Sequence, residues 1–205
     1  MKKVFYALSF IVLSFYSCTN DSGLESSEVS KGKISEVINE SNLSTQKMKY
    51  GMLNKDEKFL LWENKIKVLM EDLEINNEQK NLLIDLKNNL SASIFDDTKN
   101  NDRREVFKTV YAKEFLKKAN KLFSEEYIIT NFYYVNYKTD TGGIEDGGGA
   151  PKNCNCTTQN AVTCFSTIQN PLYCKKAESN CSKVPSNCGF LLWYDCDGMC
   201  ISNWA

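Results

Sequence analysis

The sequence predicts an α-helical bundle followed by a small disulfide-rich module of irregular structure and short β-strands. Two observations carry this prediction. Before about residue 125, apolar residues recur at spacings of three and four, which is typical of helices that bury one face. Eight of the nine cysteines lie after residue 153, in a segment with few large apolar side chains, where disulfides would substitute for a core. The 205 residues leave room for one modest domain and an appended module.

Residues 1–17 resemble a bacterial lipoprotein signal peptide. Two lysines precede an apolar stretch, residues 4–16, that is shorter than the roughly 20 residues needed to span a bilayer. Ser17 directly precedes Cys18, as a small residue does in a lipobox, although Phe15 stands where that motif usually has leucine. We expect Cys18 to carry lipid, palmitate included, and to become the mature N-terminus. The alternative is an ordinary secretory signal with a spare cysteine. Both place the protein in the cell envelope or outside the cell, and not in the cytoplasm.

Residues 18–33 are rich in Ser, Asp, Glu, Gly and Asn, which predicts a flexible tether. The helical domain is expected over residues 34–138. Its first clear helix begins at Asn54, which forms a capping-box pattern with Glu57 three residues later. The expected apolar face of this helix is Phe59, Trp62, Ile66, Leu69 and Leu73.

Two further helices follow the same logic. Asn76 and Gln79 begin one of them, and Asp102 with Glu105 begins the other. Their expected apolar faces are Leu83, Leu86 and Leu90, and then Phe107, Tyr111, Phe115, Ala119 and Leu122. Residues 127–139 are dense in aromatic and β-branched residues, so they favour a strand but could also prolong the last helix.

Residues 139–151 contain five glycines and one proline, which predicts a linker and a domain boundary. The cysteine-rich module is expected over residues 152–205. Its cysteines are Cys154, Cys156, Cys164, Cys174, Cys181, Cys188, Cys196 and Cys200. An even number of cysteines in a short exported segment predicts four disulfides, whose connectivity stays open.

The cysteine spacing argues against a metal site in this module. It contains no C-x-x-C pair and the chain contains no histidine, whereas zinc sites are usually built from close pairs of such ligands. Cys154 and Cys156 are too close together to bridge each other comfortably, so each is expected to pair further away. Asp197 and Gly198 are a strong turn signal and predict a hairpin that reverses between Cys196 and Cys200.

Composition disfavours several functions. The chain has 25 basic and 26 acidic residues, so there is no strong positive field to attract nucleic acid. The absence of histidine excludes Ser-His-Asp and Cys-His catalysis. We therefore expect a protein that is not an enzyme, with no cofactor and no nucleic-acid partner.

The sharpest local feature is an aromatic run between two cysteines. It consists of Phe190, Leu191, Leu192, Trp193 and Tyr194. These side chains would either form an exposed contact patch or serve as the miniature core of the module. The sequence leaves both interpretations open.

The motifs "NCNC", "NCG", "FLLWYDC" and "DGMC", with the lone cysteines between them, resemble fulvocin C and the bacteriocin fulvocin C-related family of Bacteroidetes. The resemblance covers about fifty residues from Asn153 onward. It implies an antibacterial module that acts on or binds the envelope of another bacterium and is released near residues 147–149. The alternative is a non-toxic surface lipoprotein whose module binds a protein or glycan, since residues 151–205 carry four lysines against three acids, too little charge for strong cationic attraction to a membrane.

Overall fold

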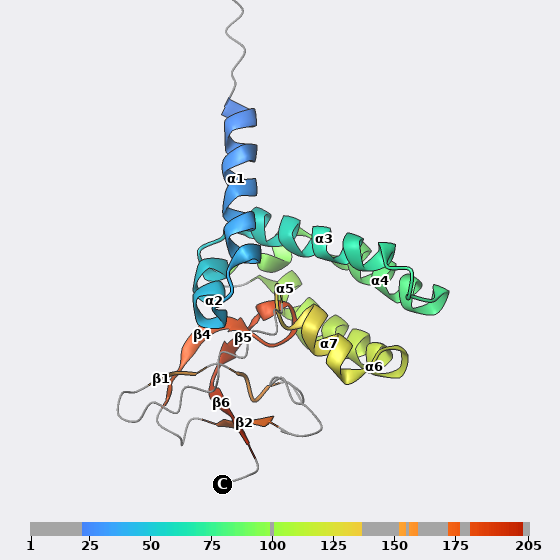
Figure 1. Ribbon diagram of the computed structural model, residues 1–205, viewed down its shortest axis with the longest axis vertical. Coiled ribbons are helices and arrows are strands. Elements are labelled where there is room, and N and C mark those ends of the chain that lie inside the picture. Colours follow the sequence, from blue (N-terminus) through green and yellow to red (C-terminus); the bar gives the residue numbers. More distant parts are fainter. Residues whose placement is uncertain are drawn as a thin grey trace, which may run out of the picture.

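The computed structural model describes residues 22–98, 101–136, 152–154, 156–159, 172–176 and 181–202. Helices occupy the first part and short strands with disulfides occupy the second, which confirms the predicted fold class (Figure 1). We call residues 22–136 the helical region and keep the name cysteine-rich module for residues 152–205. Residues 1–17, Cys18 and residues 139–151, predicted to be a signal peptide, a lipidation site and a linker, lie outside the described residues.

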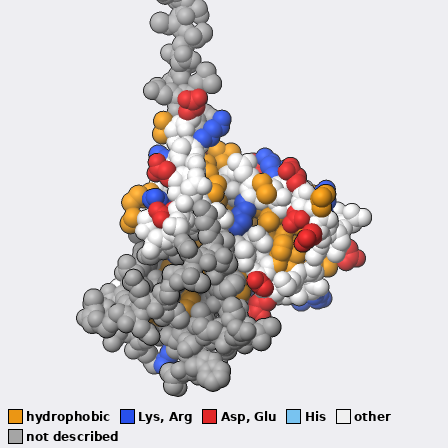
Figure 2. Space-filling view, viewed as in Figure 1, with side chains coloured by type: hydrophobic (Ala, Val, Ile, Leu, Met, Phe, Trp, Pro, Cys, Tyr) orange, Lys and Arg blue, Asp and Glu red, His pale blue; other side chains and the backbone are white. Residues whose placement is uncertain are grey.

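The helical region consists of two helical hairpins and two N-terminal helices. Its elements are α1 (Ser22–Asn39), α2 (Leu43–Gly51), α3 (Lys55–Glu71), α4 (Asn77–Asn89), η1 (Ala92–Phe95), α5 (Asp102–Val106), η2 (Phe107–Tyr111), α6 (Ala112–Leu122) and α7 (Glu125–Phe132). α3 packs on α4 and α6 packs on α7, while α1 extends away from the body (Figure 1). Acidic, basic and scattered apolar side chains share the outer face of these helices (Figure 2), as expected where the apolar stripes face inward.

Local capping chemistry sets where α3 and α4 begin. Asn54 and Glu57 form a capping box at α3, and Asn76 and Gln79 form another at α4, which confirms both predictions. At α5 the predicted start is off by one residue. The side chain of Asn101, and not that of Asp102, accepts the hydrogen bond from the amide of Arg104.

The prediction of a flexible tether over residues 18–33 is wrong from Ser22 onward, because α1 begins there. Composition misses residues 22–33 of this helix because its anchor is tertiary. Ile34 and Val37 are buried, and the ammonium of Lys33 lies 3.2 Å from the carboxylate of Glu57. Once these turns are fixed, the preceding residues extend an existing helix without a new nucleation cost.

Of the 13 residues on the predicted apolar faces, eight are buried, four are half-buried and one is exposed. Leu73 is 99% exposed because α3 ends at Glu71, before the expected stripe is complete. The ambiguous segment after the third helix is helical as far as Phe132 and forms α7. Ser124 caps α7 by accepting a hydrogen bond from the amide of Tyr127, and Ile128 faces the core.

The module contains three small two-stranded sheets within its described part. Its elements are β1 (Lys152–Asn153), β2 (Leu172–Lys176), β3 (Cys181–Ser182), β4 (Val184–Cys188), η3 (Phe190–Leu192), β5 (Tyr194–Cys196) and β6 (Gly198–Ser202). β1 pairs with β3 in parallel, whereas β2 pairs with β6 and β4 pairs with β5 in antiparallel fashion.

The predicted hairpin at Asp197 and Gly198 is wrong, because β5 and β6 belong to different sheets. Gly198 instead allows β6 to lie against β2. A Cβ at this position would lie 2.5 Å from the carbonyl oxygen of Lys175 and 2.6 Å from the sulfur of Cys174. The turn residues therefore redirect the chain from one sheet to the next.

The two regions share one hydrophobic core. All five side chains of the aromatic run belong to the same buried cluster as the apolar faces of the helices. The predicted boundary at residues 139–151 therefore does not separate two independent cores. Burial of each such side chain is worth about 1.5–3 kcal/mol, so the run contributes to the stability of the helices as well as of the module.

The shared core predicts that a change in the module destabilises the helices. Phe190 is fully buried and contacts the rings of Phe115 and Phe132. Phe190→Ala is expected to lower the free energy of unfolding by about 3–5 kcal/mol. Urea unfolding followed by circular dichroism at 222 nm, which reports the helices, measures this loss. Val110→Ala, at a position 57% exposed, is the control and should change stability by less than about 0.5 kcal/mol. Helices that unfold at the wild-type midpoint in Phe190→Ala would contradict a shared core.

Candidate functional site

The aromatic run forms a tight turn with unusual backbone angles. Asn187, Leu191 and Leu192 have φ angles of 74°, 51° and 58°, in the left-handed region that side-chain-bearing residues rarely adopt. The turn is closed by hydrogen bonds from the amide of Leu192 to the carbonyl of Gly189 and from the amide of Trp193 to that of Phe190. Each left-handed residue of this kind costs on the order of 1–3 kcal/mol, so the surroundings must hold the turn in place.

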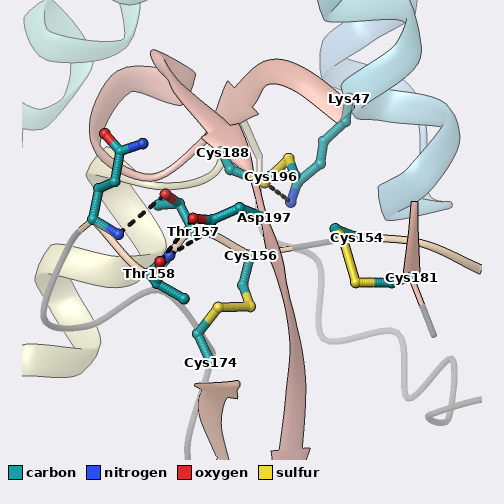
Figure 3. Close-up of a disulfide and its surroundings, with 11 residues drawn as sticks. Lys47, Cys154, Cys156, Thr157, Thr158, Cys174, Cys181, Cys188, Cys196 and Asp197 are labelled. Carbon is teal, nitrogen blue, oxygen red and sulfur yellow. Dashed lines mark hydrogen bonds between the residues drawn. A yellow bond between two sulfur atoms is a disulfide. The ribbon is translucent and has the colours of Figure 1, made fainter. Parts of the chain in front are cut away.

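One disulfide brackets the run. Cys188 and Cys196 lie on either side of it, on the paired strands β4 and β5, and are bonded with their Cα atoms 5.3 Å apart (Figure 3). The bond fixes the distance between the two ends of the turn. The run therefore enters the core as a closed loop, which has less conformational freedom to lose than an open chain.

Two further disulfides staple the rest of the module. They are Cys154–Cys181 and Cys156–Cys174 (Figure 3). Cys154 and Cys156 thus pair with different partners, which confirms the prediction drawn from their spacing. Cys200 is disulfide-bonded as well, whereas Cys164 lies outside the described residues.

The rings of the run insert between helical elements. The Phe190 ring lies 5.4 Å from that of Phe115 in α6, and 6.1 Å from that of Phe132 in α7. The Trp193 ring lies 5.3 Å from that of Phe95 in η1, and 4.8 Å edge-on from that of Phe107 in η2. Such pairs add roughly 0.5–1.5 kcal/mol each beyond burial. One turn of the module is therefore held by four separate parts of the helical region.

A buried hydrogen-bond chain fixes the depth of insertion. The indole nitrogen of Trp62 donates to the hydroxyl of Tyr50 at 3.0 Å, and that hydroxyl donates to the carbonyl of Leu191 at 3.3 Å. Burial raises the pKa of Tyr50 well above its usual value. Tyr50 thus stays a neutral donor, and it satisfies a backbone carbonyl that the left-handed turn buries.

Two lysine side chains, those of Lys47 and Lys108, contact the two ends of the run. The Lys47 ammonium lies 3.4 Å from the sulfur of Cys188 (Figure 3), and burial lowers its pKa to about 8. The Lys108 ammonium lies 4.8 Å from the centre of the Tyr194 ring, and the Tyr194 hydroxyl donates to the carbonyl of Lys108 at 3.4 Å. These contacts attach the two ends of the run to α2 and η2.

The structure corrects the interpretation of the aromatic run as a contact patch. Phe190, Leu191, Leu192, Trp193 and Tyr194 are all at most 5% exposed, so they form no surface. They are also not a core of the module alone, because their partners are helical residues. A module with so few apolar side chains buries more apolar surface by packing against the helices than by forming a core of its own.

Sequence reasoning missed the residues that receive the run. Tyr50 and Lys47 had no role in the predictions, because α2 has no strong apolar periodicity to mark it. Trp62 was expected in the core, but its link to Leu191 was not foreseen.

In comparisons with known proteins, no family model, curated protein or solved structure matches this chain. Among the described residues, no helix is both long enough and apolar enough to cross a membrane. The same residues contain no group of three or more potential metal ligands.

A second partly buried lysine ties the end of α7 to α3. The Lys65 ammonium donates to the carbonyls of Thr130 and Tyr134 and lies 5.4 Å from the centre of the Trp62 ring. Burial lowers the pKa of Lys65 to about 7. The proton of Lys65 is therefore bound less tightly in the folded protein than in the unfolded one.

These lowered amine pKa values predict a rise of stability with pH. Between about pH 7 and pH 10 the unfolded chain keeps protons on Lys47 and Lys65 that the folded chain releases, so folding is favoured as pH rises. The slope is at most about 1.4 kcal/mol per pH unit for each amine. Above pH 10 the trend reverses, because burial raises the pKa of Tyr127 to about 12 while unfolded tyrosines ionise.

Urea midpoints measured from pH 7 to pH 10 test this expectation. Lys65→Met should reduce the slope of the rise and leave the part that Lys47 contributes. Lys67→Met, at a position 42% exposed on the same helix, should leave it unchanged. An identical slope in wild type and Lys65→Met would show that the Lys65 proton does not contribute.

Proposed function

We propose that the protein is an exported, lipid-anchored, bacteriocin-like protein whose cysteine-rich module acts against or binds bacterial envelopes. The observation that carries the proposal is the set of disulfides within the module. Such bonds form and persist in oxidising compartments outside the cytoplasm. They agree with the signal-like residues 1–17 and with the cysteine motifs that resemble the fulvocin C-related family.

The proposed anchor is a lipid on Cys18. Cys18 stands only four positions before Ser22, where α1 begins. The hydroxyl of Ser30 already donates to the carboxylate of Glu57 in α3, so only the residues of α1 before Ser30 project from the body, over about 12 Å at 1.5 Å per residue. A lipid at Cys18 would therefore hold the body on a short helical stalk rather than on a slack tether.

Replacement of the lipidation site tests the anchor. Cys18→Ser is expected to abolish incorporation of labelled palmitate and to move the protein from the membrane fraction to the soluble fraction. A second cysteine lipidation site is not expected, so Cys200→Ser should retain the label. Palmitate incorporation that survives Cys18→Ser would contradict the anchor and favour an ordinary secretory signal.

Growth inhibition tests the action on envelopes. The oxidised module, cut from the folded chain in the linker and separated from the helical region in denaturant, is expected to inhibit related bacteria. Reduction should abolish the inhibition, because the three described disulfides with known partners hold the module together. Equal growth with oxidised and reduced module would count against a bacteriocin.

A second candidate function is a non-toxic surface lipoprotein with a protein- or glycan-binding module. The observation that favours it is the shared core, since a chain whose two regions pack together is suited to act as one body. Specific binding of the intact chain to an envelope component, without growth inhibition by the separated module, would select this function.

A further inference from the structure

The helical region holds the aromatic run without a covalent cross-link. Residues 22–136 contain no cysteine, so no disulfide can join this region to the module. Among the described residues, the contacts between the two include ring packing, the hydrogen bonds of Tyr50 and Tyr194, and the approach of Lys47 to Cys188. Apart from the main chain, the association is non-covalent.

The helical side of this contact is an aromatic socket. The rings that contact the run are those of Phe95, Phe107, Phe115, Phe132 and Tyr133. They come from η1, η2, α6, α7 and the residue that ends α7. We call these five residues the socket. Because its members are brought together by the packing of the helices, the socket is a property of the helical region.

The run is conformationally restricted before it binds the socket, and its side chains are too apolar to be stable in water. The Cys188–Cys196 bond closes the loop, and a closed loop loses less entropy on docking. The left-handed Leu191 and Leu192 persist only while their surroundings hold them. Outside the socket, five large apolar side chains would be exposed on a small module, and such a patch marks an interaction site.

The composition of the run fits one kind of external partner. Phe, Leu, Trp and Tyr side chains together favour the boundary between lipid tails and water, where indole and phenol groups keep a polar contact. The indole nitrogen of Trp193 is buried without a hydrogen-bond partner among the described residues. At a membrane surface this donor would reach water or a headgroup.

We propose that the helical region is an intramolecular cover: its socket binds the aromatic run and keeps it from a phospholipid surface until the two regions are separated. The biological meaning of the cover rests on the proposed function. The binding itself does not, because it concerns only the socket and the run. Cutting the linker is therefore not enough to release the module.

The test uses the full chain with a specific protease site in place of Gly147, Gly148 and Gly149. After complete cutting under non-reducing conditions, both fragments are expected to elute together from a size-exclusion column at the volume of the uncut chain. They should separate only in denaturant. Fragments that separate on cutting in native buffer, at micromolar concentration, would overturn the cover.

Two variants of the cut chain test whether the run accounts for the binding of the two fragments to each other. Trp193→Ala is expected to raise the dissociation constant of the fragments at least about 100-fold. Lys183→Ala changes a residue of the same module that is 62% exposed, and should leave the constant unchanged. If the uncut Trp193→Ala chain shows no helical circular dichroism, the variant has not folded and its dissociation constant is not interpreted. The co-elution experiment on the cut wild-type chain then tests the cover by itself.

Sedimentation with phosphatidylglycerol and phosphatidylethanolamine vesicles tests the partner, using chains that begin after Cys18. The separated oxidised module is expected to bind, while the uncut chain and the cut complex are not. Binding by the uncut chain, or none by the separated module, would overturn the assignment. Co-elution and vesicle binding without growth inhibition would uphold the cover and refute the bacteriocin function, so the two proposals fail separately.

Discussion

The structure depends on the insertion of one short turn, residues 190–194, into a core built by helices that precede it by more than fifty residues. The turn supplies rings that meet η1, η2, α6 and α7, and its backbone accepts the hydrogen bond of Tyr50. Removing these contacts would leave both a hole among the helices and an apolar surface on the module.

Disulfides and burial perform different tasks in this chain. The bonds Cys154–Cys181, Cys156–Cys174 and Cys188–Cys196 restrict the unfolded module and stabilise it mainly through that restriction. They do not supply apolar contact. Sheets of two strands cannot offer a broad face for a core of their own. The apolar side chains of the run are therefore buried against the helices. The Cys188–Cys196 bond holds the run in the closed conformation that packs there.

The sequence was informative where structure is decided locally. Asn54 and Asn76 satisfy free amides within one turn, so their capping boxes follow from spacing alone. Cysteine content likewise predicted a stapled module. Two features depend on contacts between segments far apart in the sequence: the helical conformation of residues 22–33 and the burial of the aromatic run among the helices. Local sequence patterns do not predict such contacts. The apolar periodicity also placed Leu73 on the buried face, although it is exposed. Periodicity predicts which face of a helix is buried but does not predict the residue at which the helix ends.

The lysines around the site connect the packing of the run to protonation. Trp62 donates its indole hydrogen to Tyr50, while its ring faces the Lys65 ammonium, so one side chain contacts both the hydrogen-bond chain to Leu191 and a partly buried amine. Lys47 approaches the disulfide that closes the run. Burial disfavours the charge on both amines. Undocking would take Cys188 away from Lys47 and return this amine to water, so a lower pH favours undocking through Lys47. The hydrogen-bond acceptors of Lys65 both belong to the helical region, so its protonation acts on the packing of the helices.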